Sequence, residues 1–183
     1  VMAPLADRYY GHPSGPLSVI GITGTKGKSS TAYYLKYILD EYLAEQGGPE
    51  SGIISSIDTY DGSERFESHL TTPEPLDLQR HFAHAVAAGI PYLTMEVSSQ
   101  ALKYHRVGGI HFDDGVFLNI APDHISDIEH PDFEDYFASK LLLFKVTRHA
   151  YINPNSDRFA DIQRAAAQCE QVTTFAVEGE AQY

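Results

Sequence analysis

The sequence contains few residues of the kinds that mark a secreted, membrane-spanning or nucleic-acid-binding protein. Its single cysteine, Cys169, allows no internal disulfide, so a reducing, cytoplasmic setting is expected. No apolar run approaches the roughly 20 residues that cross a bilayer. Lysine and arginine number 13 against 25 acidic residues, a net charge of −12. A general nucleic-acid-binding surface is therefore not expected, because such a surface needs clustered basic residues.

The remaining composition is that of an ordinary globular domain. The 183 residues are 43% hydrophobic and 21% charged, which suits a single domain with a sizeable core, and we expect a monomer. Residues 1–16 hold three prolines together with Asp7, Arg8 and His12. This segment is unlike a secretory signal and is predicted to be a linker into a domain at 17–183.

A glycine-rich segment follows the first short apolar run. The run covers 17–20, and Gly21-Ile-Thr-Gly-Thr-Lys-Gly-Lys-Ser-Ser30 then opens an amphipathic stretch. Such glycines let backbone N–H groups face one concavity, while the lysine adds charge and the serine reaches Mg²⁺ beside phosphates. The standard spacing would put Ile22 at its first glycine, so a shortened T-G-T-x-G-K-S form fits better. The predicted ATP-phosphate residues are Gly24, Thr25, Lys26, Gly27, Lys28, Ser29 and Ser30. The plainer alternative is a loop whose lysine is solvated at a helix start.

Apolar spacing predicts strands that alternate with helices. Strands are expected at 17–20, 52–57, 91–97, 115–120, 150–153 and 172–177, with an excursion or hairpin over 60–69. Helices are expected from the loop to about 46, from 71–74 to 88, and over 132–147 and 157–168. The first two helices should pack through Ala32, Leu35, Ile38, Leu39, Tyr42 and Leu43, and through Leu76, Leu78, Phe82 and Val86. The predicted fold class is α/β of the P-loop type, a mostly parallel sheet with helices on both faces.

Polar residues end two of the predicted strands. Glu96 terminates one, and Asn119 ends another shortly before Asp123 and His124. Parallel strands deliver their carboxyl ends to one rim of the sheet, where the glycine loop also lies. Ser29, Glu96 and His124 are therefore predicted to share Mg²⁺, a cation that prefers oxygen ligands.

Each of these residues has a simpler alternative role. Glu96 would equally suit an ion pair with a nearby lysine or arginine. His124 fits a surface group, and Asp123 a turn or helix-cap residue. Thr71 and Glu74 fit a capping box as well as a substrate loop.

Six segments together resemble one protein family. They are Tyr10-Gly-His-Pro-Ser14, the loop at 23–30, Leu70-Thr-Thr-Pro-Glu74, Glu96-Val-Ser-Ser99 with Arg106, Asn119 through His124, and Tyr136-Phe-Ala-Ser-Lys140. In this order they resemble the ATP-binding central domain of the Mur ligases, most closely the branch that adds the third residue of the peptidoglycan stem peptide. The segments 1–16 and 17–183 would then be a linker and a central domain incomplete at its C-terminus.

The resemblance implies a role for each matching residue. The loop would hold ATP, with Lys28 on its β- and γ-phosphates and Ser29 on Mg²⁺. Glu96 and His124 would be metal partners, and Lys140 would carry a carbamate that binds a second Mg²⁺. Thr71, Thr72, Ser98 and Arg106 would bind the UDP-muramoyl-peptide substrate. Burial and neighbouring cations would favour the neutral amine that carbamylation of Lys140 needs; a solvated lysine is the alternative.

The implied reaction is ATP-driven amide-bond formation through an acyl phosphate, with an amino acid as the second substrate. The family's N-terminal uridine-binding domain and C-terminal amino-acid-selecting domain do not fit in this chain, which is expected to be inactive alone. Lys26, Ser29-Ser30, Gln100 and Tyr104 depart from the usual residues of the family. The alternatives are a folylpolyglutamate or polyglutamate synthetase, a lipid II amidotransferase subunit, or a noncatalytic nucleotide-binding module.

Overall fold

The computed structural model describes residues 2–123, 125–126 and 129–176. Within them, eight strands form one sheet in the order β4-β3-β2-β5-β1-β6-β7-β8. The strands are β1 (Ser18–Thr23), β2 (Gly52–Ile54), β3 (Asp58–Tyr60), β4 (Arg65–Glu67), β5 (Tyr92–Glu96), β6 (Phe112–Phe117), β7 (Thr147–Ile152) and β8 (Gln171–Thr174). All neighbouring strands are parallel except β2–β3 and β3–β4, which are antiparallel. The mostly parallel sheet is confirmed.

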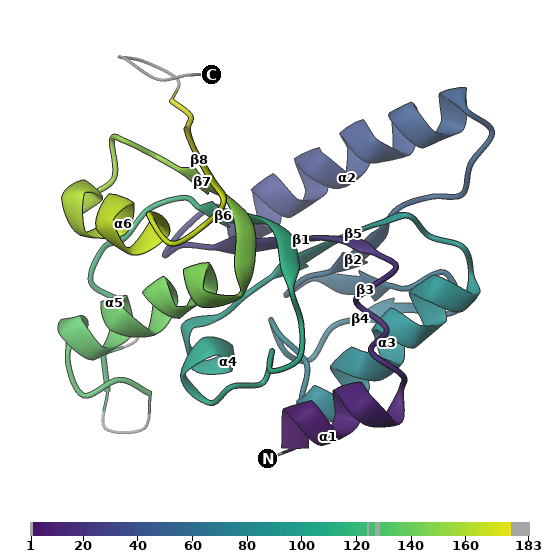
Figure 1. Cartoon of the computed structure of the whole chain (residues 1–183), viewed down its shortest axis with the longest axis horizontal. Helices are drawn as coiled ribbons and strands as arrows, with labels where there is room; N and C mark the ends of the chain where they lie inside the picture. Colours follow the sequence, from purple (N-terminus) through teal and green to yellow (C-terminus); the bar gives the residue numbers. More distant parts are fainter. Residues whose placement is uncertain (1, 124, 127–128, 177–183) are drawn as a thin grey trace.

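Helices cover both faces of this sheet, as predicted (Figure 1). They are α1 (Met2–Tyr9), α2 (Lys28–Glu45), α3 (Pro75–Ala87), α4 (Ser99–Lys103), α5 (Phe133–Leu141) and α6 (Phe159–Ala166), with a 3₁₀ helix, η1, at Leu142–Val146. Along β1, Ile22 packs with Ala32 of α2. Val19 packs in a second cluster with Phe82 of α3. Side chains of a strand point alternately to its two faces, so β1 is buried on both.

The register of the central strands brings the predicted strand ends together. Ile22 of β1 is paired with Glu96 of β5, and Thr23 is paired with Phe117 of β6. The loop after β1 therefore lies at the same rim as the end of β5 and the segment that follows β6. This is the arrangement predicted from the strand order of α/β sheets.

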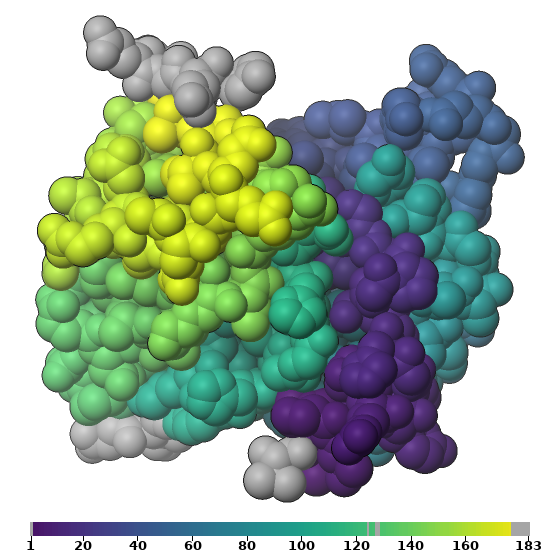
Figure 2. Space-filling view, in the orientation of Figure 1, coloured from purple at the N-terminus to yellow at the C-terminus, as the bar shows by residue number. Residues whose placement is uncertain are grey.

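Residues 1–16, predicted to be a linker, include a helix, α1, that is packed on the domain. In α1, Ala3 and Ala6 are buried, and the helix contacts α3. Figure 2 shows the purple N-terminal residues lying against the teal surface. The small side chains allow the two helices to approach closely. The proline content of the segment had not indicated a helix here.

Several predicted packing and capping details were wrong. Ile38 and Tyr42 of α2 are 64% and 49% exposed, and Leu76 and Val86 of α3 are also exposed. The capping box at 71–74 is absent from the described structure, since α3 begins at Pro75 with Glu74 as its cap residue and no side-chain cap bond. The helix expected over 132–147 is divided into α5 and η1.

The polar stretch at 60–69 forms the antiparallel hairpin β3–β4, which extends the sheet beyond β2. This outcome matches one of the two alternatives drawn from the sequence. Among the described residues, we find no helix with the length and apolar character required to cross a membrane.

Candidate nucleotide site

The glycine-rich loop depends on backbone shapes that favour glycine. Gly24 and Gly27 have φ values of +152° and +84°. A Cβ at Gly24 would lie 3.0 Å from the Leu118 Cβ, so this position requires glycine for space as well as for conformation. Gly27 caps α2 without a side-chain cap bond. The first N–H groups of the helix lack intrahelical acceptors and suit an anion at this end.

Asn119 holds the loop from the neighbouring strand end. Its Oδ1 accepts the N–H groups of Thr25 at 3.1 Å and Lys26 at 3.0 Å. Its Nδ2 donates to the Lys26 carbonyl at 3.0 Å. The predicted juxtaposition of Asn119 with the loop is present, and these three bonds fix the loop's entry into α2.

Two lysine amines converge on one loop carbonyl. The Nζ atoms of Lys28 and Lys140 each donate to the Gly24 carbonyl oxygen at 3.0 Å. Lys140 is only 2% exposed. Its pKa is lowered to about 7, first by burial and then by the positive charge of Lys28. Burial also lowers the pKa of Lys28, against the opposing effects of Glu96 and Asp123. The solvated-lysine alternative for Lys140 was wrong.

A serine that the sequence analysis missed joins two of the predicted metal partners. Ser56 donates its backbone N–H to Glu96 Oε1 at 2.9 Å, and its Oγ lies 3.2 Å from the same oxygen. Ser29 Oγ lies 3.1 Å from Ser56 Oγ. Ser56 lies two residues after the end of β2, at the same rim of the sheet as Glu96.

Glu96 itself is 1% exposed. Among the described residues, its carboxylate forms no ion pair with lysine or arginine. A direct ion pair is therefore not observed, although the Glu96 charge acts on Lys28 and opposes the lowering of its pKa. The buried carboxylate and the Ser29 hydroxyl offer the oxygen donors that Mg²⁺ prefers. His124 lies outside the described residues, and its metal role stays a prediction.

Asp123 and Lys26 form an ion pair across the loop, at 3.1 Å between Nζ and Oδ2. Lys26 has an 81% exposed side chain, so its charge is directed to solvent beside the loop. Ser30 is exposed in the first turn of α2. Thr25 is fixed from α5, because the Tyr136 hydroxyl donates to Thr25 Oγ1 at 3.2 Å. This contact of Tyr136 was not predicted from the sequence.

The predicted substrate residues gather beside the two lysines. A cleft of 150 Å³ is lined by Lys28, Leu70, Thr71, Thr72, Ser98, Ser99, Gln100, Arg106, Glu129 and Lys140. Thr72 is buried, and its hydroxyl donates to the Glu96 carbonyl at 2.9 Å and accepts the Ser98 N–H at 3.0 Å. Arg106 pairs with Glu74 at 2.9 Å. The cleft thus combines cationic and hydroxyl groups, although the Thr72 hydroxyl is already hydrogen-bonded to the backbone at Glu96 and Ser98.

These features define an α/β domain with a glycine-rich loop and a helix N-terminus at the carboxyl end of its central strand. The Mur ligase middle domain family matches residues 22–183 of the sequence. The chain belongs to this family.

Two relatives and one solved structure show the similarity in detail. The chain is 47% identical over 168 residues to the UDP-N-acetylmuramyl-tripeptide synthetase of Lactobacillus delbrueckii subsp. bulgaricus, with 90% of this chain and 32% of the relative covered. It is 48% identical over 168 residues to the UDP-N-acetylmuramoyl-L-alanyl-D-glutamate--L-lysine ligase of Enterococcus faecalis, with 91% and 32% covered. A solved UDP-N-acetylmuramoyl-L-alanyl-D-glutamate--2,6-diaminopimelate ligase superposes with a TM-score of 0.77 at 20% identity, covering 100% of this chain and 38% of that one. The chain therefore spans about a third of the length of these relatives.

Proposed function

We propose that this chain is the ATP-binding domain of a ligase that adds the third amino acid to UDP-N-acetylmuramoyl-dipeptide in peptidoglycan synthesis. The observation that carries the proposal is the single cleft lined by Lys28, Lys140, Ser98 and Arg106. It provides a place where a substrate carboxylate meets the phosphate loop. The names of the two relatives, at 47% and 48% identity, support the choice of substrate.

The loop would hold ATP through its phosphates. The N–H groups at the start of α2 and the Lys28 ammonium would contact the β- and γ-phosphates, while the helix dipole adds a favourable field. Lys28 now donates to the carbonyl groups of Gly24 and Thr25. Its amine can therefore exchange these neutral acceptors for phosphate oxygens, which form stronger charge-assisted bonds.

The buried oxygen donors fit a magnesium site. Ser29 and Glu96 would hold one Mg²⁺, with His124 as a further predicted ligand. When bound, Mg²⁺ offsets the charge of the phosphates and orients their oxygens. Ser56 would keep the Glu96 carboxylate in position through its N–H.

Lys140 would hold a second Mg²⁺ as a carbamate. Its lowered pKa of about 7 supplies neutral amine at neutral pH. The amine lone pair attacks CO₂, an N–C bond forms as one C–O π bond opens, and the proton passes to solvent. This reaction converts a buried cationic side chain into an anionic oxygen ligand.

The reaction then follows from charge and position. The substrate carboxylate attacks the γ-phosphorus, ADP leaves, and an acyl phosphate forms. The neutral amine of the incoming amino acid attacks the acyl carbon and forms the C–N bond, phosphate departs as the C–O bond breaks, and the nitrogen loses one proton to solvent. Lys28 would stabilise charge on the transferred group, and Arg106 and Ser98 would orient the muramoyl-peptide, together with Thr71. Thr72 would shape the cleft through its bonds to β5 and α4. Catalysis by such positioning needs no side-chain nucleophile.

The test uses the full-length protein with ATP, Mg²⁺, UDP-N-acetylmuramoyl-L-alanyl-D-glutamate and L-lysine, and mass spectrometry detects the tripeptide product. We expect product with the unchanged protein and a decrease in kcat of about 100-fold or more for Lys28→Met. Lys145→Met, at an exposed position of η1, is the matched control and should retain activity. Full activity of Lys28→Met would refute the assignment.

Three further measurements separate the alternatives. The isolated chain should bind nucleotide weakly and form no product. The relatives are about three times as long, and the uridine-binding and amino-acid-selecting domains would lie in that additional length. ATP affinity should depend on Mg²⁺ in the unchanged protein but not in Glu96→Ala, and this result would support a metal-assisted site. Affinity that is independent of Mg²⁺ in both proteins favours a noncatalytic nucleotide module. Glutamate addition to a folate in place of the muramoyl-peptide reaction favours a folylpolyglutamate synthetase.

A further inference from the structure

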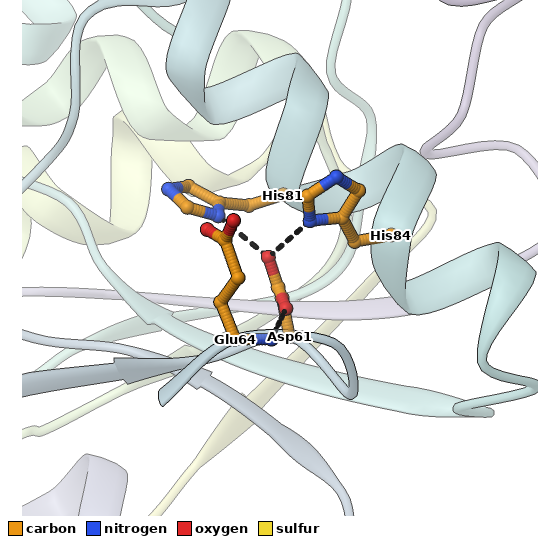
Figure 3. A group of neighbouring side chains, drawn as sticks. All are labelled: Asp61, Glu64, His81 and His84. Carbon is orange, nitrogen blue, oxygen red and sulfur yellow. Dashed lines mark hydrogen bonds and ion pairs between the residues drawn. The ribbon is translucent and has the colours of Figure 1, made fainter. Parts of the chain in front are cut away.

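A group of four metal-binding side chains lies away from the glycine loop, between the β3–β4 hairpin and α3. Figure 3 shows Asp61 and Glu64 on the hairpin turn, facing His81 and His84 on the helix. One donor atom from each of the four residues lies within 4.8 Å of all the others. Two segments separated in the sequence therefore bring two carboxylates and two imidazoles to one point.

The Asp61 carboxylate is already oriented toward the helix. Its Oδ1 accepts the backbone N–H groups of Ser63 at 3.0 Å and Glu64 at 2.7 Å. These bonds hold one oxygen in the turn and direct the other, Oδ2, at the two imidazoles. His81 Nδ1 and His84 Nδ1 lie 2.7 and 2.9 Å from this Oδ2. Because the histidines are three residues apart in α3, they occupy the same face of the helix.

The charge at this cluster also suits a cation. Asp61 is fully buried and His81 is 2% exposed. Two N–H groups of the turn and the Nδ1 atoms of both imidazoles surround the Asp61 carboxylate. In the described part of the chain, the ion-pair partners of Asp61 are these two histidines. Arg80 pairs with the partly exposed Glu64 at 3.1 Å.

We propose that Asp61, Glu64, His81 and His84 form a structural zinc site. Imidazole nitrogen and carboxylate oxygen are ligands that Zn²⁺ accepts, and four protein ligands are typical of a structural site. On binding the metal, each imidazole would release to solvent the Nδ1 proton that it donates to Asp61 Oδ2, carry a proton on Nε2, and present the Nδ1 lone pair to the metal. Two carboxylates balance the charge of a divalent ion, and Glu64 has a second oxygen that can keep its bond to Arg80.

Coordination requires the donor atoms, which lie within 4.8 Å of one another, to move by up to about 1.5 Å. Tetrahedral bonds of about 2.0–2.1 Å place neighbouring ligand atoms about 3.3 Å apart. The Nδ1–Oδ2 separations of 2.7 and 2.9 Å must therefore widen by roughly half an ångström. Glu64 belongs to an exposed turn and can adjust without moving the core. The bound metal would fasten the hairpin to α3, next to the segment that carries Thr71 and Thr72 into the substrate cleft.

The proposal is tested by titrating the metal-free protein with Zn²⁺ in excess Mg²⁺, against a chromophoric chelator. We expect saturable binding of one Zn²⁺ per chain and a rise in the melting temperature. Affinity should fall at least about tenfold in His84→Gln and in Glu64→Gln. Replacement of zinc by Co²⁺ should give the visible absorption of a tetrahedral complex, and this signal should weaken in both variants.

His111→Gln is the matched control, because His111 is exposed just before β6. Its zinc affinity should equal that of the unchanged protein. Far-UV circular dichroism in chelator checks that each variant is folded, and the exposed position of Glu64 makes Glu64→Gln the safer of the two. Equal zinc affinity in the unchanged protein, His84→Gln and Glu64→Gln would overturn the proposal, and so would the lack of saturable binding. The four residues would then form a hydrogen-bonded anchor between hairpin and helix.

Discussion

The buried amine of Lys140 should make the stability of this domain depend on pH in a particular direction. Lys140 is 2% exposed, and its amine shares the Gly24 carbonyl with Lys28. Its pKa is lowered from 10.5 to about 7 in the folded chain. The perturbation is Lys140→Met, a substitution of similar volume that removes the titrating group. All samples are kept free of CO₂ so that the amine stays unmodified.

The sign follows from the two pKa values. Between pH 7 and 10.5 the unfolded chain holds the Lys140 proton more tightly than the folded chain does, so protonation favours unfolding. The penalty is greatest below the folded pKa of about 7 and disappears above the unfolded value. Linkage then predicts that this one group raises the free energy of unfolding by about 2 kcal/mol between pH 7 and pH 9.

Urea unfolding followed by far-UV circular dichroism measures the effect at each pH. The unchanged protein should gain about 2 kcal/mol relative to Lys140→Met as the pH rises from 7 to 9. The subtraction removes the titration of groups common to both proteins. Lys145→Met, at an exposed lysine of η1, should change in parallel with the unchanged protein. Parallel pH profiles for the unchanged protein and Lys140→Met would refute the reasoning about this amine.

Three further outcomes are expected. Addition of ¹³C-bicarbonate at pH 8 should give a carbamate signal in the ¹³C NMR spectrum, and the signal should be missing in Lys140→Met; a signal that persists there would place the modification elsewhere. Gly24→Ala should lower the free energy of unfolding by about 1–3 kcal/mol, because φ is +152° and the new Cβ would meet Leu118. Gly47→Ala is the control, because a Cβ there meets no atom within 4 Å, and it should lower this free energy by less. Equal losses in the two variants would exclude the contact with Leu118 as the cause. Asn119→Ala should cost about 1 kcal/mol in urea unfolding, because the N–H and carbonyl of Lys26 lose their side-chain partner while the Thr25 N–H keeps its bond to the Asn119 backbone carbonyl; an unchanged midpoint would contradict this.

The sheet was predictable because its central strands are short apolar runs that are buried on both faces. The glycine loop and Glu96 could be placed at one rim from the strand order alone, and their register confirms it. It was harder to predict which apolar side chains of the helices are buried. Ile38 and Tyr42 follow helical spacing on α2 yet are exposed, since periodicity identifies an apolar face but does not identify what covers it.

Contacts between distant segments were beyond sequence reasoning. Asp61 precedes His81 by 20 residues, and only the packing of the hairpin on α3 brings them to 2.7 Å. Ser56 was placed inside the strand expected at 52–57, whereas β2 ends at Ile54, so its position at the rim was not predicted. By contrast, the burial of Lys140 was anticipated through the family resemblance, because its helical position alone suits a solvated lysine equally well.

Activation of a carboxylate by ATP is the central claim, and an isotope transfer tests it most directly. The full-length protein would receive UDP-muramoyl-dipeptide labelled with ¹⁸O in both oxygens of the reacting carboxylate, together with ATP, Mg²⁺ and L-lysine. An acyl phosphate requires one labelled oxygen to leave with the phosphate, so mass spectrometry should find one ¹⁸O in each phosphate released with product. Product formed alongside unlabelled phosphate would contradict the account.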